Sequence, residues 1–255
     1  MSLEATETKS WYQQWFNAPY YYLLYADRDE KEAAAFIELL IKKLQPFTEC
    51  KMLDVACGRG RHSIQLASHG FNVTGIDIST ESIEEALTHK HDRLDFFIHD
   101  MREPFRKNEY DYAFNFFTSF GYFDTRQEHE NAIRTIADAL KQHGVFLMDY
   151  LNVHYVEKHL QEKAVISRNG VDFSITRWFD DTHFYKRIEV NDPVQLSAPL
   201  SFVEQVAKFS LDDFKAIFRR FGLEIEEVYG DYTFGAYDPD HAPRLIMLAR
   251  KTMPC

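Results

Sequence analysis

The chain has 255 residues, of which 45% are hydrophobic and 15% aromatic, and its formal net charge is −11. This composition can bury the core of one large domain, with or without an insertion, and the negative charge disfavours a nucleic-acid partner because it repels phosphate backbones. No apolar run reaches the length of a membrane span and no signal-peptide pattern is present, so we expect a cytoplasmic protein without a membrane partner. The three cysteines lack metal-ligand spacing, so we expect reduced thiols and no metal site.

Residues 11–25 hold eight aromatic side chains in fifteen positions. Aromatic residues recur four positions apart, which is helical spacing, and Pro19 should divide the run into two short helices. Because short helices are marginal by themselves, this N-terminal arm, residues 1–28, must dock on another part of the chain. Three of its residues are expected to pack permanently against the long helix predicted at 29–44: Trp15, Phe16 and Leu24.

Strands and helices alternate after the arm. Short apolar runs predict five strands, at 51–57, 71–77, 94–100, 110–117 and 145–151. Apolar residues at helical spacing predict helices beside and between these strands, at 29–44, 61–70, 79–90 and 125–144. Near-continuous apolar strands that alternate with helices are typical of a doubly wound, mostly parallel α/β sheet.

The pattern changes to a period of two over residues 163–209, around turn signals at Asn169-Gly170 and Asp180-Asp181. We predict that this segment is a set of antiparallel strands inserted into the α/β domain, which comprises residues 29–162 and 210–255. A helix at 210–222 and two strands complete the α/β domain. Those two strands follow each other without a helix, so they should form an antiparallel hairpin at the edge of a seven-stranded sheet.

Three predicted strands end in residues suited to binding a nucleoside. The segment LDVACGRGRH joins the first strand to its helix through a turn, where Gly58 and Gly60 let the backbone approach a ligand and the helix offers free N–H groups. Asp77 ends the second strand, where a carboxylate can bind both ribose hydroxyls. Asp100 ends the third strand and can accept a hydrogen bond from an adenine amino group, while Met101 can pack on the ring.

Each feature also has an ordinary structural explanation, as a tight turn or a helix cap, but their joint order and spacing indicate a nucleoside cofactor. The dinucleotide fingerprint requires a third glycine, and Ser63 stands in its place. The turn instead reads DVACGRG from Asp54 to Gly60, with Ala56 at the position of a family glycine. Over roughly residues 30–150, and in its terminal hairpin, the sequence resembles the class I S-adenosylmethionine-dependent methyltransferases, whose fold is Rossmann-like.

This resemblance implies that S-adenosylmethionine is the cofactor and that its methyl group goes to an N, O or C nucleophile of a small-molecule acceptor. One group of residues would surround the methionine end: Asp54, Ala56, Gly58 and Gly60. A second group would hold the adenosine, with Asp77 on the ribose and three residues at the adenine: Ile78, Asp100 and Met101. Two aromatic residues would lie under the sulfonium, where aromatic faces stabilise a cation: Phe116 and Phe117.

The same resemblance implies that the arm is a lid over the cofactor, with Tyr21 and Arg28 reaching the cofactor carboxylate. The inserted strands would either roof the acceptor pocket or form a homodimer interface. No catalytic base is identified, and four residues are candidates: Tyr122, Asp149, His154 and His183. Five other histidines are expected to be surface or helix residues: His62, His69, His89, His91 and His99.

Two other functions remain open on the residues alone. An NAD-dependent oxidoreductase would use a similar turn, although the third glycine and a Tyr-x-x-x-Lys pair are missing. A non-catalytic nucleoside-binding protein could also use this fold, because a fold does not fix a function.

Overall fold

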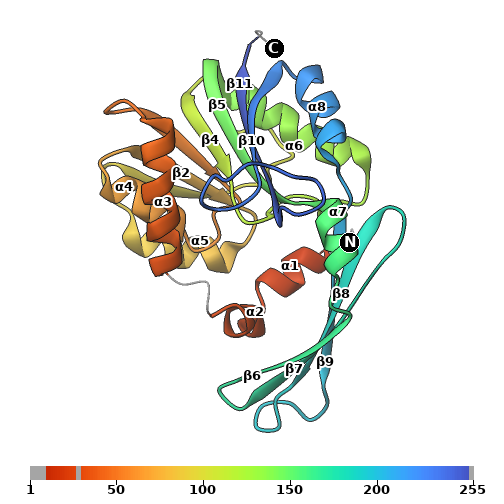
Figure 1. The fold of residues 1–255 in the computed structure, drawn as a ribbon. Coiled ribbons are helices and arrows are strands. Elements are labelled where there is room, and N and C mark those ends of the chain that lie inside the picture. The colour runs from red at the N-terminus through yellow and green to blue at the C-terminus, as the bar shows by residue number, and fades with distance from the viewer. Residues whose placement is uncertain (1–9, 27–29, 253–255) are drawn as a thin grey trace, which may run out of the picture.

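The computed structural model of the protein describes residues 10–26 and 30–252. Its larger sheet has seven strands in the order β10-β11-β5-β4-β1-β2-β3 (Figure 1). Five strands of this sheet run parallel: β1 (Lys51–Val55), β2 (Asn72–Asp77), β3 (Leu94–Ile98), β4 (Tyr110–Asn115) and β5 (Leu140–Leu151). The last two strands form the expected antiparallel hairpin at one edge: β10 (Leu223–Tyr229) and β11 (Arg244–Lys251). The predicted α/β fold with a terminal hairpin is confirmed.

Helices cover both faces of this sheet because each face presents a row of buried apolar side chains. One face packs on three helices, α3 (Glu30–Leu44), α4 (Arg61–Ser68) and α5 (Thr80–Ala86), the last followed by a short 3-10 turn (Leu87–His89). The other face packs on two helices, α6 (Arg126–Ala139) and α8 (Leu211–Arg220). Side-chain oxygens cap α5, α6 and α8 as their sequences suggest, from Ser79, Thr125 and Ser210.

The boundary between α6 and β5 differs from the prediction. The helix expected to reach residue 144 ends at Ala139, and β5 begins at Leu140, where the backbone turns extended with φ −71° and ψ 141°. Leu140 is fully buried and pairs with Tyr110 of β4. Pairing with a buried neighbouring strand therefore outweighs the helical spacing of this segment. A short helix after β5, α7 (Val153–His159), was also not predicted.

A second, four-stranded antiparallel sheet has the order β6-β7-β8-β9. Its strands fall within the segment predicted to be antiparallel: β6 (Lys163–Arg168), β7 (Val171–Phe179), β8 (His183–Asn191) and β9 (Leu200–Ala207). In Figure 1 this sheet extends away from the larger sheet, with the arm between the two. Among the helices of the described ranges, none has both the length and the apolar character needed to cross a membrane.

The arm forms the two expected short helices, α1 (Trp11–Phe16) and α2 (Pro19–Leu24), but it packs in a different place. Trp15 is fully buried and Leu24 is nearly so, and both belong to a cluster with the inner face of the second sheet rather than with α3. From Val171 to Ile175 every second residue of β7 is apolar and buried, which offers the arm an apolar surface. Phe16 lies at the edge of the same cluster, where its ring meets Tyr122. The expected packing of these residues on the long helix is therefore wrong.

Candidate active site

A cavity of about 820 Å³ lies at the carboxyl ends of the parallel strands, the usual ligand position in an open α/β sheet. The arm and the second sheet contribute to its walls. Ten of the predicted site residues line it: Tyr21, Asp54, Ala56, Gly58, Asp77, Ile78, Asp100, Met101, Phe116 and Phe117. Gly60 does not line the cavity, and Arg28 lies outside the described residues.

The glycine-rich turn after β1 has three residues in the left-handed region: Ala56 at φ +60°, Gly58 at +55° and Gly60 at +80°. A Cβ atom on Gly60 would lie 2.6 Å from the ring of Phe96, so glycine is required here for the close approach of α4 to the sheet. Beside Gly58 the space is open, because a Cβ there would meet no atom within 4 Å. Gly58 therefore leaves room for a ligand, whereas Gly60 serves packing.

Asp77, the last residue of β2, is hydrogen-bonded through its carboxylate to the turn that follows β1. One carboxylate oxygen accepts the backbone N–H of Gly58 at 2.8 Å, and the other accepts that of Ser79 at 2.8 Å. Burial raises the pKa of Asp77, although these backbone hydrogen bonds oppose the shift. Each oxygen keeps a lone pair for a further donor from the cavity.

Asp54 is the more deeply buried carboxylate, with 1% of its surface exposed. The Ser63 hydroxyl on α4 donates to it at 2.6 Å. Burial raises the pKa of Asp54 to about 7, and the negative charge of Asp77 adds to the effect. The cavity therefore has, beside the glycine turn, an acid that changes its charge near neutral pH.

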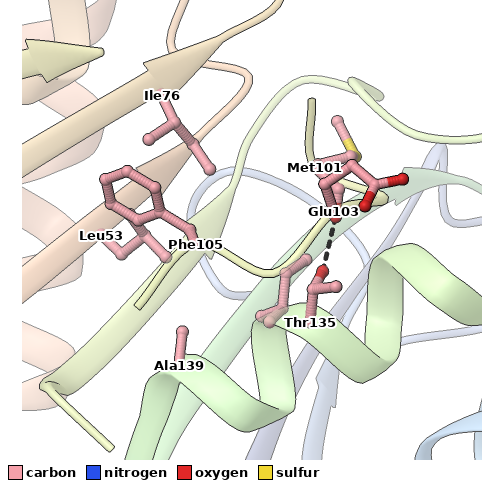
Figure 2. Close-up of a pocket in the computed structure, with 8 residues that line it drawn as sticks. Leu53, Ile76, Met101, Glu103, Phe105, Thr135 and Ala139 are labelled. Carbon is pink, nitrogen blue, oxygen red and sulfur yellow. Dashed lines mark hydrogen bonds between the residues drawn. The ribbon is translucent and has the colours of Figure 1, made fainter. Parts of the chain in front are cut away.

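Asp100 does not stand alone at the end of the third strand. Arg102 binds both of its carboxylate oxygens, through Nε at 3.1 Å and Nη2 at 2.6 Å. Burial opposes the change, but these hydrogen bonds lower the pKa of Asp100. The next residue, Met101, is held through its backbone carbonyl, which accepts the Thr135 hydroxyl of α6 at 2.5 Å. Figure 2 shows this bond beside a separate void of about 10 Å³, which holds a water at most.

The turn after β4 is held in an unusual conformation. Phe117 and Thr118 both have positive φ, +55° and +57°. The fully buried Asp149 of β5 accepts the backbone N–H of Phe117 at 2.8 Å and the hydroxyl of Tyr232 at 3.1 Å. Arg244 donates to the same carboxylate at 2.6 and 2.8 Å and to the Thr118 hydroxyl at 2.7 Å. This buried ion pair fixes the turn on which the aromatic wall of the cavity depends.

An aromatic stack forms that wall. The Phe117 ring lies between the His62 ring, with centroids 5.0 Å apart, and the Tyr232 ring, at 4.8 Å. His62 is on helix α4 but only 5% exposed, so it is not a surface residue. Burial lowers the pKa of His62 well below its ordinary value of 6.5, which keeps the ring neutral. A neutral imidazole can stack there without adding charge to the cavity.

Comparisons with known proteins agree with this geometry. A family model described as a methyltransferase domain matches residues 52–144. The chain is 26% identical to the dTDP-3-amino-3,4,6-trideoxy-alpha-D-glucopyranose N,N-dimethyltransferase of Streptomyces venezuelae over 230 residues, which cover 84% of this chain and 92% of that protein. A solved S-adenosylmethionine-dependent methyltransferase of Clostridium acetobutylicum ATCC 824 matches with a TM-score of 0.73 at 18% identity, covering 91% of this chain and 95% of that one.

The chain contains a methyltransferase domain and has the fold of solved S-adenosylmethionine-dependent methyltransferases. A further structure, an S-adenosylmethionine-bound amino pentose methyltransferase of Micromonospora echinaspora, matches with a TM-score of 0.69 at 20% identity, over 92% of this chain and 98% of that one. The protein is thus an S-adenosylmethionine-dependent enzyme, and the dehydrogenase and non-catalytic alternatives are set aside.

Of the four candidate bases in this methyltransferase, Tyr122 lines the cavity, and its hydroxyl donates to the Thr118 carbonyl. Asp149 is committed to the ion pair with Arg244. His154 and His183 do not line the cavity.

Several cavity residues of the methyltransferase were not predicted from the sequence. Tyr232 and Arg244 come from the loop before β11 and from that strand itself, and three charged residues come from the second sheet: Arg177, Lys186 and Glu204. A signal was present for Arg244, which is a cation directly before the apolar run of residues 245–249.

Proposed function

We propose that this methyltransferase transfers the methyl group of S-adenosylmethionine to an N, O or C nucleophile of a small-molecule acceptor. The observation that carries the proposal is a cavity of about 820 Å³ lined by the glycine turn, the arm and the second sheet together. Small-molecule sites usually span about 300–1,000 Å³, so this volume suits a nucleoside cofactor with a small acceptor beside it. The Streptomyces relative, whose name gives an amino sugar as its acceptor, supports a small acceptor as well.

The residues that line the cavity fit the cofactor. Open space beside Gly58 and the remaining lone pairs of Asp77 suit a ribose with two hydroxyls, and the buried Asp54 suits a cationic group. S-adenosylmethionine supplies an electrophilic methyl group on a sulfonium. The faces of Phe116 and Phe117 are suited to stabilise that cation, by roughly 0.5–2 kcal/mol each. At the adenine end, the amino group would share Asp100 with Arg102.

The chain itself must orient the acceptor and exclude water. The Asp149–Arg244 pair holds the turn at Phe117, so this ring cannot retreat from the cavity. Fixed geometry of this kind can contribute several kcal/mol to a transfer reaction, on the order of 7–11 at best. Tyr122 is the candidate for polar contact with the acceptor nucleophile, because it lines the cavity beside this turn.

Calorimetric titration tests the cofactor assignment, and a screen tests the acceptor. We expect saturable binding of S-adenosylmethionine and none of NADH, followed by release of S-adenosylhomocysteine with one or more small acceptors, amines first. Asp77→Ala is the control for cofactor-independent signals. Transfer to bulk protein or RNA, with none to any small molecule, would contradict the proposed acceptor class.

The arm is proposed to act as a lid. The Tyr22 hydroxyl lies 2.6 Å from that of Ser82, and Arg59 stacks on the Tyr22 ring at 3.3 Å, so the arm contacts the adenosine side of the cavity. Cofactor entry requires these contacts to open, which exposes the arm to proteases. We expect S-adenosylhomocysteine to slow tryptic and chymotryptic cleavage within the arm. Equal cleavage rates with and without ligand would show that the arm is not a lid.

The second sheet is proposed to roof the acceptor end, because charged residues of β7, β8 and β9 line the cavity. The other interpretation, a homodimer interface, rests on Trp178 and Phe179, which are 37% and 42% exposed. Sedimentation of a Trp178→Ser, Phe179→Ser variant decides between them. A dimer that the variant disrupts would favour the interface, and an unchanged monomer with full activity would favour the roof.

A further inference from the structure

A row of three charged residues crosses the second sheet and faces the cavity. Arg177 of β7 pairs with Lys186 of β8, which in turn pairs with Glu204 of β9. Directly paired residues of neighbouring strands project from the same face of a sheet. All three also line the cavity, so their charges face the space in which an acceptor would lie.

Two members of this row compensate each other. Lys186 Nζ lies 3.3 Å from Glu204 Oε2, and the two side chains are only 16% and 15% exposed. The other Glu204 oxygen accepts Trp15 Nε1 at 2.7 Å and the Tyr25 hydroxyl at 2.9 Å. Glu204 is therefore occupied by Lys186 and by the arm, and it does not serve as the partner of Arg177.

Arg177 is different from the other cations of the cavity wall. The four others each have a carboxylate partner, in these pairs: Arg59–Glu85, Arg61–Glu32, Lys186–Glu204 and Arg244–Asp149. The Arg177 side chain donates from Nη1 to the uncharged Gln161 carbonyl, at 3.1 Å. Within residues 10–26 and 30–252, no carboxylate forms an ion pair with it. Since a guanidinium has five N–H donors, several remain for a ligand.

An unpaired cation is notable in a chain with a net charge of −11, because acidic partners are abundant. We propose that Arg177 binds an anionic group of the acceptor, a carboxylate or a phosphate. A guanidinium recognises either group through two parallel hydrogen bonds. The inference rests on the proposed small-molecule acceptor and specifies that this acceptor carries a negative charge. Its anionic end lies at Arg177, and its nucleophilic end faces the turn at Phe117.

Arginine side-chain NMR tests this directly, with the protein saturated by S-adenosylhomocysteine at constant ionic strength. The probes are acetate, inorganic phosphate and, as an uncharged analogue, acetamide. We expect a saturable shift of the Arg177 Nε–Hε signal with acetate, phosphate or both, and none with acetamide. The anion that saturates at the lower concentration identifies the group, a carboxylate or a phosphate.

Three variants complete the test. Arg177→Gln should weaken binding of the effective anion at least tenfold, and Arg177→Lys should retain part of it. The matched control is Arg187→Gln, an exposed cation of the same sheet that does not line the cavity, and it should bind like wild type. Thermal unfolding and S-adenosylhomocysteine affinity, measured for each variant, show whether the fold and the cofactor site are intact.

Two results would overturn the inference: no saturable shift with either anion, or equal anion affinity in wild type and Arg177→Gln. Neither result touches the proposed function, which is judged by the acceptor screen. Conversely, Arg177-dependent anion binding in a protein that methylates no small molecule would retain the anion site and refute the acceptor class.

Discussion

The buried carboxylate of Asp54 makes the behaviour of this methyltransferase depend on pH near neutrality. Its pKa is about 7, against an ordinary value of 3.8, chiefly because burial penalises the charged form. At about 1.36 kcal/mol per pKa unit, the difference is worth on the order of 4 kcal/mol. The folded state thus binds a proton more tightly than the unfolded state does between about pH 4 and pH 7.

The sign of the effect on stability follows from this difference. Stability due to protonated Asp54 is fully present below pH 4 and is lost as the pH rises through about 7. Asp54→Asn removes the charge and keeps an oxygen that can accept the Ser63 hydroxyl. We therefore expect the variant without ligand to be more stable than wild type at pH 8, by up to about 4 kcal/mol in free energy of unfolding. The difference should fall to about 1.6 kcal/mol at pH 5 and disappear below about pH 4.

Ligand binding should couple to the same proton. A cationic group beside Asp54 favours the carboxylate, so binding of S-adenosylhomocysteine, through its ammonium, should release a proton below pH 7. Calorimetry in two buffers of different ionisation enthalpy measures this release. For the wild-type protein we expect binding to release close to one proton at pH 6 and little at pH 8. Asp54→Asn should show no such proton release at either pH. Equal proton release by wild type and variant at pH 6 would refute the reasoning.

Three other substitutions, with one control substitution in helix α4, test the cavity wall. Asp77→Ala should weaken cofactor affinity at least tenfold, since each lost hydrogen bond to a charged acceptor is worth about 1.5–3 kcal/mol, and unchanged calorimetric affinity in a folded variant would exclude Asp77 from the site. Ala56→Gly should raise the free energy of unfolding by about 0.5 kcal/mol, because alanine is strained at φ +60°. The control Ala67→Gly in α4 should lower the free energy of unfolding by about 1 kcal/mol or more. If urea denaturation showed the same loss of stability in both variants, this prediction would be contradicted. Arg244→Met should cost about 3–5 kcal/mol, because it leaves Asp149 buried without its cation, and a loss below about 1 kcal/mol in the same assay would argue against a tightly coupled pair.

Local pattern was enough to predict the sheet and one wall of the site. The period of the apolar residues identifies each strand and its buried faces, and parallel strands bring their carboxyl ends to one edge. Asp54, Gly58 and Asp77 therefore meet at the cavity without any knowledge of distant contacts. The second sheet was also predictable from local pattern, because Asn169-Gly170 and Asp180-Asp181 fix two of its turns.

Tertiary structure alone decided which distant side chains complete the site. Arg244 reaches Asp149 across 95 residues of sequence, and Glu204 meets Trp15 of the arm across 189. It also decided that the arm packs on the second sheet and that β5 begins at Leu140. Periodicity shows that a face must be buried, but several faces in one chain satisfy that need equally well. The choice among them depends on shape, charge pairing and hydrogen bonds that exist only once the chain has folded.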